Sequence, residues 1–243
     1  MRTPPLPLAS LRARSGQACS VAWLSCALLV PSALSAQTKP MTADEMHKLH
    51  SDAKAYIAML EDPARDAYQK PHEVLMALGL KAGERIADIG AGAGYFTLRF
   101  AQHVGDTGVV YGVDISPDMI LHLNQRVREA RLDNVRTILA QPDDPLLPDR
   151  SIDRFFICET WHHIADHPKY FAQMKKILKP GGQVIIIDFH KKETPVGPPM
   201  EMRVSREEVL KEFQDSGFRL AKEHTFLPYQ YFLIFTAAPA GGK

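Results

Sequence analysis

The sequence predicts an α/β protein in which a doubly wound, mostly parallel seven-stranded sheet carries helices on both faces. From residue 85 to residue 236, short β-branched or apolar segments alternate with amphipathic ones, which is the pattern of successive βα units. The segment from Gln183 to Phe189 is almost entirely apolar, as expected of a strand buried on both faces of a parallel sheet. A glycine-rich turn joins the first strand to the helix that follows it.

The first predicted element is one amphipathic helix over residues 42–60, because apolar residues recur there at intervals of three and four. We expect residues 37–70 to form a helical cap over the binding site of the domain that follows. That domain is predicted to span residues 71–238. Its first helix begins at Pro71 and ends at Gly79, since proline favours the first turn of a helix and glycine the residue after its end.

The remaining elements follow in an alternating order. Strands are predicted near residues 85–89, 109–114, 135–140, 152–159, 183–189, 218–224 and 230–236. Helices are predicted over residues 94–104, 117–131, 168–178 and 206–216. Residues 239–243 are expected to be a flexible tail.

The amino-terminal segment, from Met1 to about Ala36, has the pattern of a secretory signal peptide. It carries three arginines and no acid, then an apolar run from Val21 to Val30, then small residues. That run is shorter than the roughly 20 residues of a membrane-spanning helix, so no stable membrane insertion is expected after cleavage. The sequence therefore predicts a periplasmic or secreted protein, and a cytoplasmic one if translation starts at Met41.

Composition argues against several classes of partner and scaffold. Without the signal segment, 26 basic residues stand against 28 acidic ones, which leaves no electrostatic footprint for nucleic acid. Of the three cysteines only Cys158 lies beyond that segment, so the mature chain can form no internal disulfide. The expected partner is a small-molecule substrate, and the oligomeric state is left open.

The most informative segment is the strand and turn from Arg85 to Thr97, in which Gly90, Gly92 and Gly94 alternate with alanine. Glycine lets a backbone approach a ligand closely, and a helix that begins beyond the turn directs unpaired N–H groups to the same place. About twenty residues later another strand ends in Asp114, the position at which doubly wound folds bind ribose hydroxyls. Together these features predict a nucleoside site.

Three motifs are informative together: Asp88-Ile-Gly-Ala-Gly-Ala-Gly94, Val113-Asp-Ile-Ser116 and Leu178-Lys-Pro-Gly-Gly-Gln-Val184. In these motifs the chain resembles the class I S-adenosylmethionine-dependent methyltransferases. Within them it is similar to the bacterial group that includes the ubiquinone and menaquinone biosynthesis methyltransferases. The resemblance implies a Rossmann-like sheet with an antiparallel terminal strand and S-adenosylmethionine as cofactor. It covers most of residues 70–190 and identifies no substrate.

The resemblance also implies a set of cofactor-binding residues. Where family members place an aspartate near adenine, this chain has Gln141, so either Gln141 or Asp143 is expected there. The cofactor-binding residues expected are Asp88, Gly90, Gly92, Gly94, Asp114, Ile115, Gln141 and Asp143.

His162 and His163 follow the fourth predicted strand, at the sheet edge where ligands bind in open α/β folds. Either is a candidate general base, because histidine titrates near neutrality, while the alternative is that the pair only builds the loop. A metal site formed by Glu159, the two histidines, Asp166 and His167 is the less favoured interpretation, because the segment has no zinc-binding spacing.

The sequence therefore predicts an exported methyltransferase that transfers the cofactor methyl group to an oxygen, nitrogen or carbon atom of a small molecule. Methyl transfer from a sulfonium depends chiefly on alignment of donor and acceptor, so a dedicated catalytic residue is optional. Two alternatives remain: an oxidoreductase that binds NAD(P), disfavoured because Tyr95 stands where a third fingerprint glycine belongs, and a non-catalytic nucleoside-binding protein of the same fold.

Overall fold

The computed structural model describes residues 41–238, so the predicted signal segment and the predicted tail lie outside the described residues. A seven-stranded sheet has the order β3-β2-β1-β4-β5-β7-β6. All neighbours pair in parallel except β7, which is antiparallel to both β5 and β6. The strands are β1 (Arg85–Ile89), β2 (Val109–Asp114), β3 (Val135–Leu139), β4 (Ile152–Cys158), β5 (Leu178–Phe189), β6 (Phe218–His224) and β7 (Gln230–Ala237). This is the predicted mostly parallel sheet with an antiparallel strand near its end.

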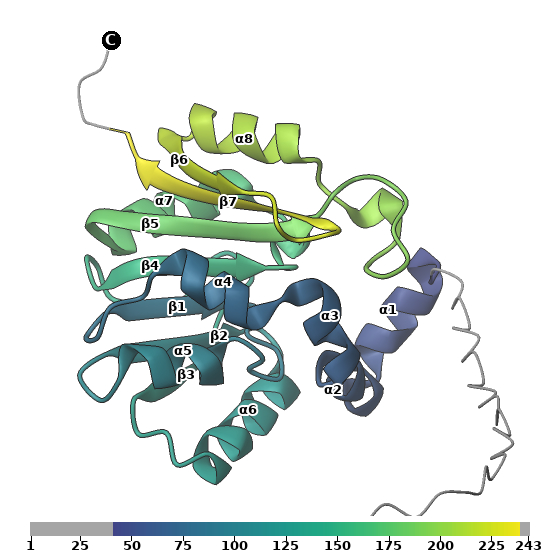
Figure 1. Ribbon diagram of the computed structural model, residues 1–243, viewed down its shortest axis with the longest axis horizontal. Coiled ribbons are helices and arrows are strands. Elements are labelled where there is room, and N and C mark those ends of the chain that lie inside the picture. The colour runs from purple at the N-terminus through teal and green to yellow at the C-terminus, as the bar shows by residue number, and fades with distance from the viewer. Residues whose placement is uncertain (1–40, 239–243) are drawn as a thin grey trace, which may run out of the picture. The chain divides into compact units, whose positions relative to one another are not determined.

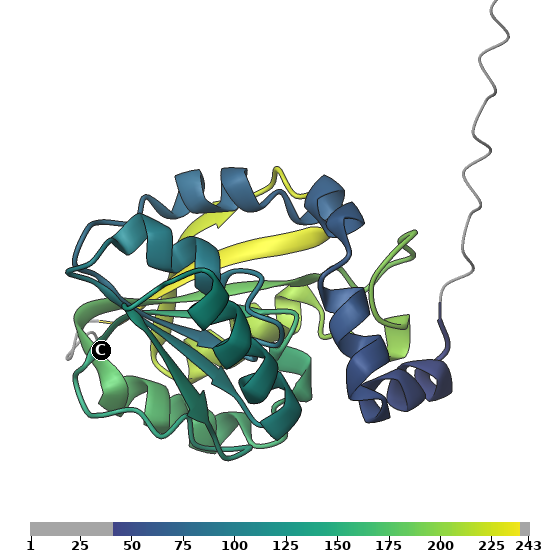
Figure 2. The ribbon, with the colours of Figure 1, turned by 90° about the horizontal axis from the view of Figure 1, so that it is seen from below.

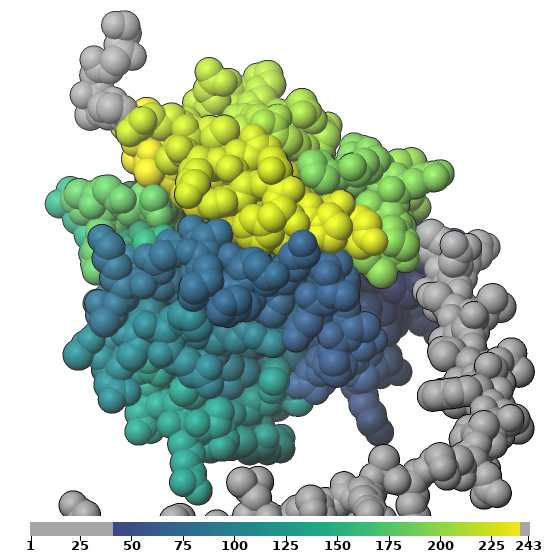
Figure 3. Space-filling view, in the orientation of Figure 1, coloured from purple at the N-terminus to yellow at the C-terminus, as the bar shows by residue number. Residues whose placement is uncertain are grey.

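Helices lie on both sides of the sheet (Figure 2). Those of the main domain are α4 (Pro71–Leu78), α5 (Thr97–Val104), α6 (Pro117–Glu129), α7 (His167–Ile177) and α8 (Arg206–Asp215), with short 3₁₀ turns η2 (Trp161–His163) and η3 (Met200–Met202). In the space-filling view, the segment that includes α4 (blue) covers one face beside the carboxyl-terminal strands (yellow) (Figure 3).

Strand β5 shows why two separate cores form. Val184 and Ile186 pack into the cluster that includes α7 and α8, whereas Ile185 and Ile187 pack into the cluster that includes α4 and α5. Successive side chains of a strand point to opposite faces, so a continuous apolar run supplies both cores at once. The prediction of a doubly buried fifth strand is confirmed, although the strand begins at Leu178 rather than at Gln183 because Ile152 of β4 pairs with Leu178.

The cap, described here over residues 41–70, differs from its prediction. The expected single helix is two, α1 (Ala43–Ser51) and α2 (Ala53–Leu60), followed by η1 (Pro63–Arg65) and α3 (Asp66–Gln69). Asp52 separates α1 from α2 with an extended backbone, and its carboxylate accepts a hydrogen bond from the Ala55 N–H at 3.1 Å. An aspartate that caps a new helix competes with continuation of the old one.

The cap and the green loop before α8 lie at the end of the sheet toward which β1 and β4 point (Figure 1). Across the described residues, no helix is both long enough and apolar enough to cross a bilayer.

Candidate functional site

A cavity of about 800 Å³ opens at the carboxyl ends of β1, β2 and β4. Further walls come from the turn after β3, from the cap and from the loop over residues 190–204, which contributes Pro195 to Pro198 and Met202. The chain leaves β1 toward β2 and β3 and then returns to β4 on the other side of β1. Such a switch point leaves a crevice between the loops after β1 and β4, where ligands bind in open α/β sheets.

The loop after β1 supplies backbone to the cavity wall. The N–H groups of Gly90 and Ala91 both donate to the Val113 carbonyl, at 2.8 and 3.0 Å, which ties this loop to the end of β2. A Cβ at Gly90 would lie 2.2 Å from Thr160 Oγ1, and one at Gly92 would lie 2.9 Å from Leu60 Cδ1 of the cap. Side chains at these two positions are therefore excluded, and the bare backbone lines the cavity.

Two of the predicted cofactor residues do not line the cavity. A Cβ at Gly94 would meet Leu123 Cδ1 at 2.3 Å, so this glycine makes room for α6, and α5 begins only at Thr97. Asp143 is ion-paired with Lys169, on the outer side of the turn that follows β3. The motif spacing did not reveal on which side of their turns these residues lie.

Asp114 lines the cavity and also fixes the loops around it. Its carboxylate accepts hydrogen bonds from the Gly92 N–H and the Ser116 N–H, at 2.8 and 2.9 Å. Each carboxylate oxygen has a second lone pair, so acceptor capacity remains for a ligand. The neighbouring Ile115 lines the cavity although it is 59% exposed, and Gln141 lines it after β3.

Asp88, the next-to-last residue of β1, is a buried carboxylate that also contacts the cavity. Burial raises the pKa of Asp88 to about 7, against the opposing effect of a hydrogen bond from Thr97 Oγ1 at 2.6 Å. The carboxylate therefore sits beside the glycine loop, in a place where small changes in its surroundings decide whether it is ionised.

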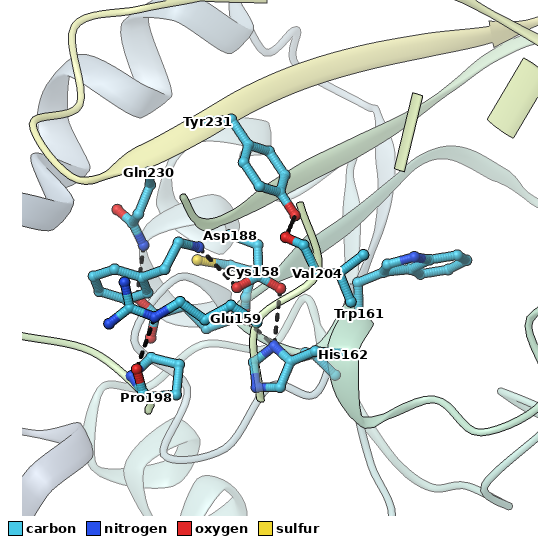
Figure 4. A network of polar contacts seen from close by, with 12 residues as sticks. Cys158, Glu159, Trp161, His162, Asp188, Pro198, Val204, Gln230 and Tyr231 are labelled. Carbon is cyan, nitrogen blue, oxygen red and sulfur yellow. Dashed lines mark hydrogen bonds and ion pairs between the residues drawn. The ribbon is translucent and has the colours of Figure 1, made fainter. Parts of the chain in front are cut away.

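The two adjacent histidines have different environments. His162 Nδ1 lies 2.9 Å from Asp188 Oδ2, and the two side chains are 3% and 0% exposed; Figure 4 shows them pointing toward one another from η2 and from β5. Burial lowers the pKa of His162, but Asp188 and Glu159 together more than offset it, so the pKa of His162 is raised. Burial together with His162 and His50 lowers the pKa of His163.

Sequence reasoning missed Arg65, which ties the cap to the site. Its guanidinium donates to the Leu60 carbonyl at 2.8 Å, pairs with Glu159 at 3.5 Å and lies 4.4 Å from the centroid of the Tyr95 ring. Glu159 has a positive φ of 55° and also accepts a hydrogen bond from Gln230 Nε2 at 2.6 Å. An arginine in a Pro-Ala-Arg-Asp segment carries no motif that would have indicated these contacts.

The charge of the cavity wall is acidic. Of the described residues that line it, five are carboxylates and Arg65 alone is a lysine or arginine. The carboxylates are Asp62, Asp88, Asp114, Asp118 and Glu159. In residues 41–238 no group of three or more histidine, cysteine, aspartate or glutamate side chains is placed to hold a metal ion.

A glycine loop, an acid at the end of the next strand and a cavity at the switch point define a nucleoside-binding α/β domain. The family model described as "Methyltransferase domain" matches residues 80–224, and the chain belongs to this family. S-adenosylmethionine, the cofactor of these methyltransferases, fits the acidic wall. Its sulfonium and ammonium groups carry two positive charges against the one negative charge of its carboxylate.

Individual relatives agree with this assignment. The chain is 30% identical to a SAM-dependent methyltransferase from Aquifex aeolicus of known structure, with a TM-score of 0.72 over 74% of this chain and 96% of that one. It is 29% identical over 123 residues to the ubiquinone/menaquinone biosynthesis C-methyltransferase of Psychromonas ingrahamii, covering 50% of this chain and 48% of that protein. The chain thus spans about half the length of the curated relatives it matches.

A third likeness concerns the fold alone. The [4+2]-cyclase SpnF is 16% identical, with a TM-score of 0.63 over 83% of this chain and 98% of that one. One fold carries many activities, so the chemistry of this chain has to be argued from its own cavity.

Proposed function

We propose that this chain methylates a small molecule in the cavity at the switch point, with S-adenosylmethionine as methyl donor. The observation that carries the proposal is the convergence of the Gly90–Gly92 backbone and the Asp114 carboxylate on one cavity. In this assignment Asp114 binds the ribose hydroxyls, Ile115 packs on adenine and Gln141 accepts a hydrogen bond from the adenine amino group. Asp88 and the backbone at Gly90 and Gly92 bind the methionine end.

The charge of the cavity favours this cofactor over a nicotinamide dinucleotide. NAD(P) carries a pyrophosphate, which in doubly wound folds binds at a helix N-terminus, and a third glycine of the fingerprint lets that helix pack closely on the strand. Here five carboxylates and one arginine line the described part of the cavity, and Tyr95 replaces that glycine. A cationic ligand is stabilised by such a wall, whereas a pyrophosphate is repelled.

Calorimetric titration of the chain from Gln37 onward with S-adenosylmethionine, S-adenosylhomocysteine and NAD tests the proposal. We expect micromolar binding of either sulfur nucleoside and none of NAD. Binding of NAD alone would favour the oxidoreductase, and no binding of any of the three would overturn the cofactor assignment. Tight nucleoside binding without turnover of any acceptor would support a non-catalytic binding protein.

We propose further that the protein is exported, on the strength of the signal pattern in residues 1–36. Mass spectrometry of the native protein checks this. A mature chain that begins near Gln37 is expected, whereas a chain that begins at Met41 would place the protein in the cytoplasm.

A further inference from the structure

The pairing of β4 with β5 places a histidine and an aspartate in hydrogen-bond contact beside the cavity. Cys158 at the end of β4 lies opposite Ile187 of β5, so the residues just after β4 lie close to the last residues of β5. Asp188 continues β5, and His162 follows β4 through the turn of η2. This geometry brings His162 Nδ1 to 2.9 Å from Asp188 Oδ2.

The position of Asp188 fixes which nitrogen of His162 is free to react. An ionised Asp188 accepts a hydrogen bond from the Nδ1–H, which leaves Nε2 as the basic nitrogen of the neutral ring. In Figure 4 Nδ1 is turned to Asp188 and the other ring nitrogen is turned away from it. His162 lines the cavity. An orienting acid, an imidazole and a ligand space in sequence form the arrangement of a general base.

The surrounding charges favour proton uptake by His162 among the histidines of the cavity. Asp188 and Glu159 raise the pKa of His162, while burial and Arg203 lower it, with a net rise. His163 is in ring contact with His162, with centroids 4.1 Å apart, and His50 from α1 is 5.3 Å from His163. The pKa of each of these two is lowered, in both cases first by burial. His162 is therefore the most basic of the three histidines among the described lining residues of the cavity.

The cap and the 190–204 loop contribute a group of apolar side chains to the cavity: Met41, Met46, Pro195, Val196, Pro198 and Met202. The cap also contributes polar and aromatic side chains, namely His50, Ser51, Tyr56, Asp62, Arg65 and Tyr68. Arg65, the single lysine or arginine among the described lining residues, is already paired with Glu159. An anionic acceptor would thus find no unpaired cation among these residues, whereas an uncharged apolar molecule would bury its surface favourably.

A general base helps only an acceptor that must lose a proton. An imidazole removes a proton more readily from a phenol, whose pKa lies near the value of about 10 found for tyrosine, than from an aliphatic alcohol, which is a much weaker acid. Neutral amines attack without prior loss of a proton. Among oxygen and nitrogen acceptors, a phenolic hydroxyl therefore best matches both the base and the apolar side chains of the cavity.

We propose that His162, oriented by Asp188, is the general base for methylation of a phenolic hydroxyl on an uncharged, apolar acceptor; this rests on the proposed function. The bound cofactor supplies a methyl carbon whose bond to the positively charged sulfur breaks with the electron pair remaining on sulfur. The acceptor oxygen forms the new bond to that carbon, and its proton passes to His162 Nε2. The imidazolium then releases the proton to solvent, which leaves a neutral ether and S-adenosylhomocysteine.

The test uses 4-nitrophenol, because its phenolate absorbs visible light and its neutral form does not. The full chain is saturated with S-adenosylhomocysteine, and the spectrum of the bound probe is recorded as a function of pH. We expect the phenolate-to-phenol ratio of bound probe to exceed that of free probe about tenfold at the same pH, equivalent to one pKa unit. This readout reports proton abstraction without turnover.

Variants separate the base from the residue that positions it. His162→Gln should return the ratio to that of free probe, and Asp188→Asn should lower it and shift the pH profile, because an amide no longer stabilises the imidazolium. With S-adenosylmethionine as donor, His162→Gln should slow release of S-adenosylhomocysteine by roughly 10²–10⁴-fold. His72→Gln, an exposed histidine of α4 outside the cavity, is the matched control and should leave the ratio unchanged.

The other possible results distinguish failure of the cofactor assignment from failure of the proposed base and from failure of the proposed acceptor. Failure to bind S-adenosylhomocysteine would overturn the proposed function, and this inference with it. If that ligand binds but 4-nitrophenol does not, or if the ratio is the same in wild type and His162→Gln, the base and the phenolic acceptor are wrong while the cofactor assignment stands. Binding of 4-nitrobenzoate as tight as that of 4-nitrophenol would contradict the uncharged acceptor.

Discussion

The two halves of the cavity are held in place by different means. The half that is proposed to bind the cofactor, called the cofactor half, consists of loops at strand ends. Backbone N–H groups of Gly90, Ala91 and Gly92 fix it through the Val113 carbonyl and the Asp114 carboxylate. The other half consists of the cap and the 190–204 loop, where arginine side chains reach backbone carbonyls. The first half is part of the sheet, whereas the second depends on a few long side chains.

Because of this difference, we expect substitutions in the two halves to change different properties of the protein. Changes in the cofactor half should disturb folding and cofactor binding together, because the same hydrogen bonds serve both. Changes in the other half should alter the local order of its loops with little effect on the cofactor. Four predictions test this contrast.

The largest effect is expected for Gly90→Ala. The backbone at Gly90 has a φ of +67°, and a Cβ there would lie 2.2 Å from Thr160 Oγ1. The left-handed backbone and the overpacking should together cost about 2–5 kcal/mol of unfolding free energy, with at least a ~10²-fold loss of S-adenosylhomocysteine affinity. Denaturant unfolding and calorimetry measure these two quantities.

Gly79→Ala is the matched control for Gly90→Ala. Gly79 also has a positive φ, of +55°, but its Cβ would meet nothing within 4 Å. It should lose about 1–2 kcal/mol of stability and keep its affinity. Equal losses of affinity in the two variants would contradict a cofactor role for the Gly90 loop.

The second effect concerns pH and Asp88. Because burial raises the pKa of Asp88 from 3.8 to about 7, folding favours its protonated form, and that stabilisation is present below pH 4 and lost as the pH rises through 7. Relative to Asp88→Asn, wild type should lose on the order of 2–4 kcal/mol of unfolding free energy between pH 4 and pH 8. Denaturant unfolding of both proteins across this range measures the difference.

Asp106→Asn, at an exposed aspartate in the turn before β2, should run parallel to wild type across the same pH range. A curve for Asp88→Asn that also parallels wild type would show that the Asp88 carboxylate is not the source of the pH dependence.

The third effect is expected for Asp114→Ala. The substitution removes the acceptor of the Gly92 and Ser116 N–H groups together with the proposed ribose contact, and hydrogen bonds to a charged group contribute about 1.5–3 kcal/mol. Affinity for S-adenosylhomocysteine should fall by roughly 10²-fold in calorimetry. Asp118→Asn removes another carboxylate of the cavity and is the control. An equal loss of affinity in Asp118→Asn would show that Asp114 acts only through its negative charge and not through a specific ribose contact.

The sequence predicted the cofactor half far better than the other half. Asp88, Gly90 and Asp114 lie at or next to the ends of strands, and the hydrophobic pattern and the glycines that mark these ends can be read from short stretches of sequence. The structure places all three residues at the cavity. The same motif spacing misplaced Gly94 and Asp143, because spacing along a turn does not tell which side faces the sheet. The mostly parallel sheet with helices on both faces and its doubly buried fifth strand were likewise predictable from alternation and hydrophobicity.

The contacts of Arg65, Asp188 and Arg203 were not predictable in the same way. Arg65 pairs with Glu159 and Asp188 with His162, and both pairs join segments that are distant in the sequence. Arg203 binds carbonyls of the irregular loop that precedes it. No periodicity encodes which of several polar residues will meet once the sheet has formed. The break of the cap helix at Asp52 was a local signal that the hydrophobic spacing concealed, because the apolar pattern continues across it.

The smallest effect is expected for Arg203→Lys, which tests the half that side chains hold together. The Arg203 guanidinium donates to the carbonyls of Pro198, His190 and Lys192, at 2.7, 3.0 and 2.7 Å. An ammonium cannot reproduce this planar fork. Backbone amides of residues 190–204 should therefore exchange with deuterium about tenfold faster, which corresponds to about 1.4 kcal/mol of local opening free energy.

Affinity for S-adenosylhomocysteine should change less than about twofold in Arg203→Lys, because no cofactor contact is assigned to this loop. Arg206→Lys is the control, since Arg206 pairs with the carboxylate of Glu223 rather than with loop carbonyls, and the exchange of residues 190–204 should be unchanged in it. If Arg203→Lys weakened the cofactor as much as Asp114→Ala does, the two halves of the cavity would be one cooperative unit. The contrast between a half fixed by the sheet and a half fixed by side chains would then be wrong.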